Sequence, residues 1–376
     1  MNTAVTVDVG DFDQLLVALR SRGFDPVGPT VRDETIVYDR IEGLRDLPVG
    51  WTDDQEAGTY RLERRNDDAL FGYVVGPHSF KKYLFPPRHT LFTLEKTVDG
   101  VKLVDKAEPV PQFAFIGVRP CELAAMEIQD RVFGAGPFSD PEYVNRRDRA
   151  FVVTVNCVVT GGTCFCASMG TGPRAQEGFD LAVTEILETN SHRLLVEAGS
   201  PRGEEVLADV PHRPAETGDL AEADRLLEQA ATRMGRSLDT EGIKELLLGN
   251  LEHPRWERVG DLCLTCTNCT MVCPTCFCAT VEDAQSLDGS TAERIRSWDS
   301  CFTNEFSYIH GGSLRTSPAA RYRQWMTHKL ASWIDQFGTS GCVGCGRCIT
   351  WCPVGIDITK IAALIRTSEE KKHALA

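Results

Sequence analysis

Short apolar runs alternate with helical patterns over roughly the first 240 residues of the chain. The runs at 113–118 and 150–155 are rich in β-branched and aromatic residues, as buried strands are. After the first run, Pro120 stands where a helix start favours proline, and a helical pattern continues from Cys121. A strand, a tight turn and a helix form an arrangement whose strand ends collect ligands. The pattern therefore predicts an α+β or α/β domain over residues 1–240.

The pattern changes after about residue 198. Residues 199–219 are rich in Pro, Gly and charge, which is typical of an exposed connection with little structure. Helical patterns over 221–234 and 241–251 then lead into the first group of cysteines. A chain of 376 residues is longer than one average domain requires, so we expect a second domain over 241–376.

Two cysteine runs of identical spacing form an internal repeat in this second domain. Each has the pattern C-x2-C-x2-C-x3-C-P, and the copies begin at Cys263 and Cys342. The insertion between them contains a helical pattern over 318–337, with Ser317 as the predicted N-cap and Gly338 as the stop. We expect this helical insertion to position the second cysteine loop against the first. Its basic residues are expected on a solvated face, and the alternatives are docking of an acidic partner or raising of a cluster potential; they are Arg315, Arg321, Arg323, His328 and Lys329.

The pattern of each run is that of bacterial ferredoxins with two [4Fe-4S] clusters, in which the fourth cysteine of each run ligates the other cluster. On this chain it predicts a first cluster bound by Cys263, Cys266, Cys269 and Cys352. It predicts a second cluster bound by Cys342, Cys345, Cys348 and Cys273. Zinc sites are the alternative, but the duplication, the x3 spacing and the following proline exceed what a tetrahedral zinc site requires. We therefore expect a ferredoxin-like electron-relay domain, since fully ligated irons leave no open position for a substrate.

The first domain holds four further cysteines: Cys121, Cys157, Cys164 and Cys166. The first two follow the predicted strands closely, so they can face one crevice. We expect the four to bind a third iron–sulfur cluster. Two alternatives stay open from the residues alone: buried free thiols, which pack as small hydrophobes, and a reactive thiolate of Cys121 at the helix N-terminus.

The last three cysteines are Cys276, Cys278 and Cys301. The first two lie in the tetrad Thr-Cys-Phe-Cys at 275–278, which repeats the tetrad at 163–166. Ligation of a cluster and lining of the electron path are alternatives. Because the three have no obvious fourth ligand, we interpret them as packing residues or as neighbours of a cluster.

Composition narrows the location and the partners. The N-terminus lacks the pattern of a secretory signal, and fifteen cysteines in a non-secreted chain indicate cluster ligation in a reducing cytoplasm rather than disulfides. A formal net charge of −14 argues against binding of nucleic acid. No apolar run approaches the roughly 20 residues of a membrane span.

Four motifs resemble the iron–sulfur β subunit of cytoplasmic sulfhydrogenases; they lie at 117–125, 163–173, 273–278 and 341–348. The resemblance covers nearly the whole chain. It implies a heteromeric complex in which the chain passes electrons between a flavin-bearing, NAD(P)-binding subunit and the small and large subunits of an NADP-linked [NiFe] hydrogenase. An electron-transfer subunit of anaerobic sulfite reductase belongs to the same family, so a sulfite reductase complex is the alternative.

The chain carries no nucleotide-binding G-x-G-x-x-G or P-loop motif, so nucleotide binding is expected in another subunit. We expect a non-catalytic electron-transfer subunit. A different hypothesis is a stand-alone redox enzyme that uses the crevice of Cys121 and Cys164. A redox sensor would need a DNA-binding or signalling module, and none is recognised in the sequence.

Overall fold

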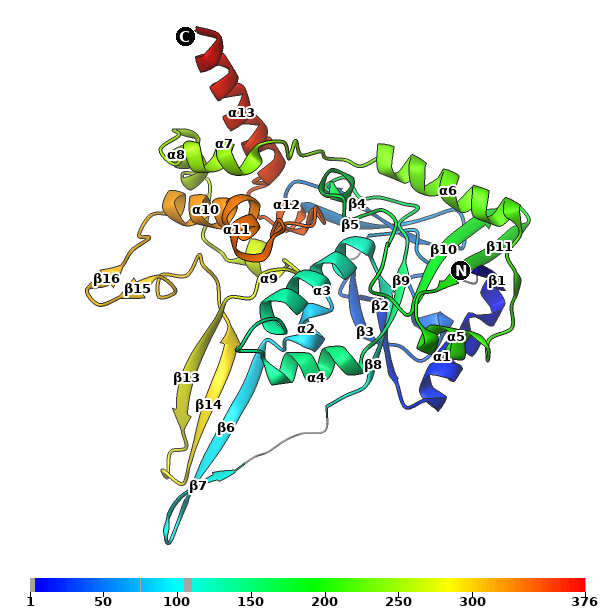
Figure 1. Ribbon diagram of the computed structural model, residues 1–376, viewed down its shortest axis with the longest axis horizontal. Coiled ribbons are helices and arrows are strands. Elements are labelled where there is room, and N and C mark those ends of the chain that lie inside the picture. Colours follow the sequence, from blue (N-terminus) through cyan, green and yellow to red (C-terminus); the bar gives the residue numbers. More distant parts are fainter. Residues whose placement is uncertain (1–3, 75, 105–109, 376) are drawn as a thin grey trace.

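The computed structural model describes residues 4–74, 76–104 and 110–375 and shows a mixed α/β architecture (Figure 1). Its largest sheet has eight strands in the order β12-β1-β11-β10-β9-β8-β2-β3. The neighbours β2, β8, β9 and β10 run parallel, whereas β10 with β11 and β2 with β3 are antiparallel. The strands are β1 Ala4–Asp8, β2 Asp25–Arg32, β3 Thr35–Arg40, β8 Phe113–Val118, β9 Phe151–Val155, β10 Leu181–Glu188, β11 Ser191–Ala198 and β12 Arg213–Pro214. Both strands predicted from apolar runs are therefore present, in the interior of this sheet.

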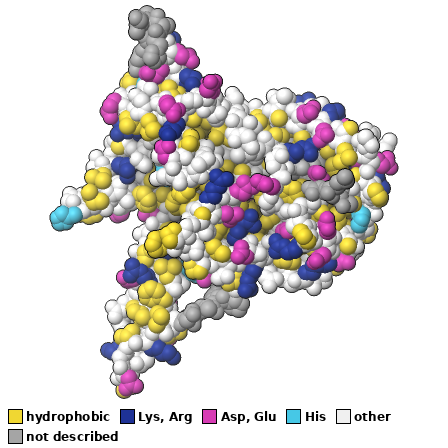
Figure 2. All heavy atoms as spheres, viewed as in Figure 1, with side chains coloured by type: hydrophobic (Ala, Val, Ile, Leu, Met, Phe, Trp, Pro, Cys, Tyr) yellow, Lys and Arg dark blue, Asp and Glu magenta, His cyan; other side chains and the backbone are white. Residues whose placement is uncertain are grey.

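A second sheet projects from the body of the molecule (Figure 1). It has the order β13-β14-β6-β7, with β6 Arg88–Thr97, β7 Gly100–Val104, β13 Ala279–Gln285 and β14 Thr291–Trp298. Hydrophobic side chains lie along its visible face in Figure 2. The exposed hydrophobic residues of its strands and turns include Val98, Val101, Leu103, Val281 and Leu287. This sheet joins strands from both sides of residue 240, so the two expected domains share it. The boundary itself stays a prediction.

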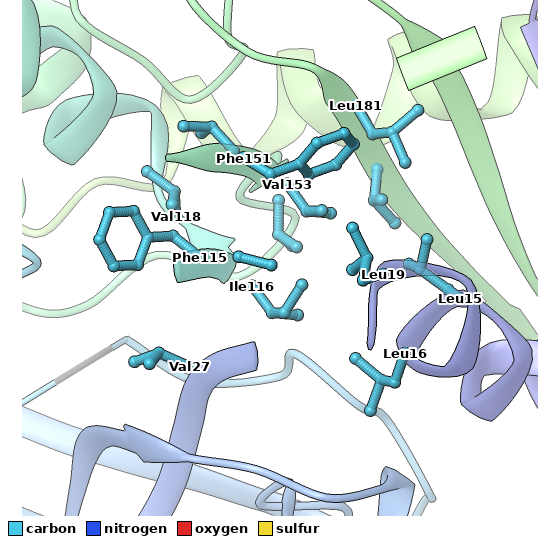
Figure 3. Packing of buried hydrophobic residues seen from close by; sticks show 14 of the residues in the cluster. Leu15, Leu16, Leu19, Val27, Phe115, Ile116, Val118, Phe151, Val153 and Leu181 are labelled. Carbon is cyan, nitrogen blue, oxygen red and sulfur yellow. The ribbon is translucent and has the colours of Figure 1, made fainter. Parts of the chain in front are cut away.

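The main core lies between the large sheet and its helices. Leu15, Leu16 and Leu19 of α1 share one helix face and point toward Ile116 and Val153 of the sheet in Figure 3. Strand β8 is buried along its whole length, as expected for a parallel strand covered on both faces. The helices of this part are α1 Phe12–Ser21, α2 Lys81–Leu84, α3 Pro120–Phe133, α4 Pro141–Arg149, α5 Pro201–Leu207 and α6 Thr217–Thr232, with short 3-10 turns at Val9–Asp11, Leu44–Asp46 and Cys166–Met169.

The prediction of little structure over 199–219 is wrong. The segment contains α5, β12 and the start of α6. Ser200 Oγ accepts a hydrogen bond from the backbone N–H of Gly203 at 3.1 Å, and Pro201 occupies the first turn of α5. A polar cap followed by proline starts a helix, so residues that suggested a loop by composition form a helix start by position.

The C-terminal part packs a helical cluster around the cysteine loops. Its elements are α7 Ile243–Gly249, α8 Arg255–Gly260, α9 Asn268–Met271, α10 Pro318–Thr327, a π-helical segment His328–Ser332, α11 Trp333–Phe337, α12 Arg347–Thr350 and α13 Ile358–Leu375. Two hairpins complete the fold: β4 Trp51–Glu56 with β5 Thr59–Arg64, and β15 Tyr308–Ile309 with β16 Gly312–Ser313. Within the described ranges, no helix is long and apolar enough to cross a membrane.

The helix predicted over 318–337 is present, with one interruption. Ser317 Oγ accepts a hydrogen bond from Ala320 N at 3.1 Å, and Gly338 follows the last turn with φ of 71°. The π-helical segment separates α10 from α11.

Candidate metal centres

The two cysteine loops share their backbone conformation at equivalent positions. Thr265 and Thr267 in the first loop have φ of 50° and 69°, and Gly344 and Gly346 in the second have φ of 65° and 74°. Left-handed φ is strained for a β-branched residue, yet the first loop adopts it twice. The repeat read from the cysteine spacing is therefore also a repeat of loop geometry.

The first predicted ligand set lines one hollow. Cys263, Cys266, Cys269 and Cys352 all border it, together with Cys348. Burial raises the pKa of Cys269 well above its usual value, and the thiols of Cys263, Cys352 and Cys266 raise it further. Cys352 of the second run thus lies with three cysteines of the first, as a crossed arrangement requires.

The second predicted set is assembled in the same crossed way. Burial raises the pKa of Cys348, and the neighbouring thiols of Cys342, Cys345 and Cys273 add to that increase. Cys273 comes from the first run, so each run contributes its last cysteine to the other set. The assignment of ligands to clusters itself stays a prediction.

Backbone N–H groups point at several of these sulfurs. The N–H of Ile356 donates to Cys352 Sγ at 3.3 Å. Backbone donors from Thr265 and Gly344 lower the pKa of Cys263 and Cys342, although burial raises both more strongly. Such donors stabilise thiolate-bound clusters and help to set their potential, so the loops fit the group that the spacing implies.

A single metal ion and a four-iron cube require different separations of the ligand sulfurs. Among the described residues, no group of three or more His, Cys, Asp or Glu side chains is arranged to hold a single metal ion. In a four-iron cube each cysteine binds a different iron, so the ligand sulfurs lie farther apart than around one zinc ion.

A buried lysine lies against the second set. Lys329 is 5% exposed, and its Nζ donates to Cys273 Sγ at 3.1 Å and to Thr275 Oγ1 at 2.9 Å. Burial lowers the pKa of Lys329, but the thiols around it, Cys273 first, raise the pKa more, so the ammonium form is favoured. A hydrogen bond with Cys276 and the charge of Lys329 hold the pKa of Cys273 well below its usual value despite burial.

The expectation that the basic residues of this helix are solvated is wrong for Lys329 and Arg321, which are buried. The sequence did contain a signal for Lys329. It stands four residues after Trp325 and four before Trp333, on one stripe of a helix between two buried tryptophans.

The four cysteines of the first domain also converge. Burial raises the pKa of Cys166, and the thiols of Cys164, Cys157 and Cys345 raise it further. Burial also raises the pKa of Cys121 well above its usual value, and the thiols of Cys166 and Cys345 raise it further. The N–H of Phe165 donates to Gly344 O at 2.8 Å, so this set lies directly against the second cysteine loop.

Two buried arginines, whose role is not evident from the sequence, accompany these four thiols. Arg119 and Arg347 are each 3% exposed, and Arg119 Nη1 lies 3.8 Å from Cys157 Sγ. Arg347 Nη2 pairs with Glu122 Oε1 at 3.1 Å. Among the described residues, Arg119 Nε and Arg347 Nη1 are buried without a hydrogen-bond partner. Unpaired cationic N–H groups beside four thiols fit an anionic cluster, whose sulfur atoms accept hydrogen bonds.

The last three cysteines lie beside the second set, because the thiol of Cys276 hydrogen-bonds to Cys273. Cys276, Cys278 and Cys301 line a cavity of about 480 Å³ next to Lys329. A hydrogen bond with Cys278, together with burial, raises the pKa of Cys301, and the same hydrogen bond lowers the pKa of Cys278 to about 7. The structure therefore gathers all three thiols instead of scattering them through the core.

Comparison with known proteins identifies the segment that contains the two cysteine runs. Residues 262–356 match the family described as a 4Fe-4S dicluster domain. The chain is 32% identical to the protein named Sulfhydrogenase 2 subunit beta of Pyrococcus furiosus over 314 aligned residues. The alignment covers 82% of this chain and 89% of that protein. No solved structure matches the chain.

Proposed function

The chain belongs to the family of sulfhydrogenase beta subunits, and on this premise we propose that it is the iron–sulfur electron-transfer subunit of a cytoplasmic [NiFe] hydrogenase complex. The observation that carries the proposal is that Cys352 borders the hollow of Cys263, Cys266 and Cys269, and that Cys273 lies near Cys348, inside a segment that matches a 4Fe-4S dicluster domain. Crossed ligation is the arrangement of two-cluster ferredoxins, whose work is electron transfer.

The ligand assignment follows the crossed loops. Cys263, Cys266, Cys269 and Cys352 hold one cluster. Cys342, Cys345, Cys348 and Cys273 hold the other. When bound, such cubes accept and release single electrons. The residues of the chain hold the cubes at fixed separation, supply N–H donors to their sulfurs and offset their negative charge with Lys329.

The four cysteines of the first domain extend this path by a third cluster. The thiol of Cys345 in the second loop raises the pKa of Cys121, Cys164 and Cys166, so the second site adjoins this set. Cys266 of the first loop is exposed, whereas Cys164 and Cys166 are buried. Electrons therefore enter or leave at the exposed first loop and pass inward through the second.

The partners follow from what the chain lacks and what it resembles. A flavin- and NAD(P)-binding subunit supplies the nucleotide site, and the small and large hydrogenase subunits supply the catalytic metal site. The fifteen cysteines, none in a disulfide among the described residues, suit the reducing cytoplasm.

Iron and acid-labile sulfide per chain, measured on anaerobically purified protein, test the cluster content. About eight irons support two clusters alone, and each further cluster adds about four irons, which the variants assign to a site. The variant Cys164→Ala should lower the content by about four irons if the third cluster exists, and leave it unchanged otherwise.

The relay itself is tested in the assembled complex. Cys348→Ala should abolish hydrogen-dependent reduction of NADP+ while hydrogen oxidation with an artificial acceptor persists. Full retention of NADP+ reduction in this variant would contradict the proposed electron-transfer role of the second cluster. Sulfite reduction by the purified complex, without hydrogenase activity, supports the sulfite reductase alternative; turnover by the isolated chain supports the stand-alone enzyme.

A further inference from the structure

Three cysteines outside the sets assigned above share one cavity. Cys276, Cys278 and Cys301 line it from the segment after the first cysteine run and from the turn after β14. The thiols of Cys278 and Cys301 are in hydrogen-bond contact. The N–H of Asp299 donates to Cys278 O at 2.9 Å, which holds the two segments together. A core that only needed small hydrophobic side chains would not require three thiols to border the same cavity.

The segment that carries Cys276 and Cys278 repeats the environment of the segment at 163–166 as well as its sequence. Thr163 and Thr275 are both fully buried, with 0% exposure. Phe165 N donates to the carbonyl of Gly344, and Thr275 Oγ1 donates to the carbonyl of Gly341 at 2.7 Å. Each tetrad therefore fixes a pair of cysteines against the second cysteine loop.

A fourth ligand is available on the cavity wall. His328 borders the same cavity. Its Nε2 lies 3.3 Å from Gln336 Oε1, and its ring packs edge-on against Trp333 with centroids 5.6 Å apart. These contacts orient the ring and leave Nδ1 as the ligand atom. Imidazole replaces cysteine in known iron–sulfur centres, so a mixed set is chemically sound.

Positive charge surrounds the site. Lys329 and Arg315 border the cavity. Lys81 is 5% exposed, and its Nζ donates to the carbonyl of Cys276 at 3.1 Å. Three thiolates and an iron–sulfur core carry net negative charge, and buried ammonium groups offset the unfavourable burial of that charge.

We propose that Cys276, Cys278, Cys301 and His328 bind a further four-iron cluster, with three thiolate ligands and one imidazole. The site shares no ligand with the three sites proposed above, although it adjoins the second one, because the thiol of Cys276 hydrogen-bonds to that of Cys273.

Iron and acid-labile sulfide per full-length chain, measured anaerobically, test the proposal. The double variant Cys278→Ala with Cys301→Ala should lose about four irons and about four sulfides relative to the unmodified chain. His328→Ala should retain three thiolate ligands, lose about one iron and show the electron paramagnetic resonance signal of an oxidised three-iron cluster. This second variant removes no cysteine, so it keeps the test valid if the double variant fails to fold.

Gln324→Ala is the matched control, because Gln324 stands one helical turn before His328 and borders the same cavity. It should leave iron, sulfide and spectrum unchanged. Unchanged iron in the double variant, or an unchanged spectrum in His328→Ala, overturns the ligand set. Loss of the first-domain cluster through Cys164→Ala is a separate result, since it concerns different residues.

Discussion

The Nζ atom of Lys329 lies 3.1 Å from the Sγ atom of Cys273, and both side chains are buried. The two residues are 56 positions apart, so only the folded chain brings this charge to this sulfur. A fixed positive charge beside a cluster ligand favours the reduced, more negative state of the cluster. The contact therefore links the packing of the inserted helix to the potential of the second site.

Lys329→Met should make the potential of the second cluster more negative. A hydrogen bond to a charged group contributes about 1.5–3 kcal/mol, which corresponds to a shift of roughly 65–130 mV for a one-electron couple. Potentiometric titration followed by electron paramagnetic resonance measures the shift. Lys102→Met removes an exposed lysine of β7 and should change nothing. An unshifted potential in Lys329→Met contradicts the proposed role of the charge.

The left-handed positions of the two loops should respond in opposite directions to substitution. Thr267→Gly relieves a strained φ and should raise the free energy of unfolding by about 1 kcal/mol. Gly344→Ala should lower it by at least about 2 kcal/mol, because a Cβ there lies 2.7 Å from Cys166 Cα and the φ is unfavourable as well. Apparent melting temperatures of anaerobic protein, compared at one scan rate, measure both. Equal changes in stability for the two variants would show that the segment of Cys166 does not pack closely against Gly344.

Arg347→Met should leave the carboxylate of Glu122 buried without its cation. Removing one partner of a buried pair destabilises by about 3–5 kcal/mol, and protonation of Glu122 limits the loss at low pH. The double variant Arg347→Met with Glu122→Gln should recover part of the lost stability. Additive losses in this double-mutant cycle would mean that the two groups do not stabilise each other.

Asp53 makes the free energy of unfolding depend on pH. Burial raises the pKa of Asp53 to about 6, although the backbone N–H of Val74 and the side-chain amide of Gln55 oppose the increase. The folded carboxyl holds its proton more tightly than the unfolded one, so the free energy of unfolding falls as the pH rises from about 4 to about 6.

Asp53→Asn should remove this dependence. Its melting temperature relative to the unmodified chain should increase between about pH 5 and pH 6 and level off above about pH 7. Asp54→Asn, at the exposed neighbouring position, is the control. A constant difference across this range would contradict the raised pKa.

The cysteine loops were predictable because their geometry is local. Ligand spacing within a run is set by a short stretch of backbone, so the sequence indicates the loops directly; the crossing of the fourth cysteines is inferred from the pattern of two-cluster ferredoxins and stays a prediction. The strands β8 and β9 were also predictable from a short stretch of sequence, because burial on both faces of the sheet requires a continuous apolar run.

The charges around the sites were not predictable in this way. Arg119 and Arg347 are buried because distant segments meet around them, and no local pattern separates such arginines from solvated ones. The convergence of Cys301 with Cys276 and Cys278 likewise depends on where β14 ends. The prediction of a loop over 199–219 was wrong because composition does not take into account that Ser200 directly precedes Pro201, an order that starts a helix.

The sheet that joins β6 to β14 limits how the cluster-binding part can be reused in engineering. Its register runs from Thr291 opposite Glu95 to Ser297 opposite Arg88. A fragment cut at residue 241 would lose both strands of the 88–104 hairpin and uncover the backbone hydrogen-bonding groups of β14, which would promote aggregation. An engineered fragment that contains the cluster-binding part must therefore also include residues 88–104, either as a second chain or through circular permutation.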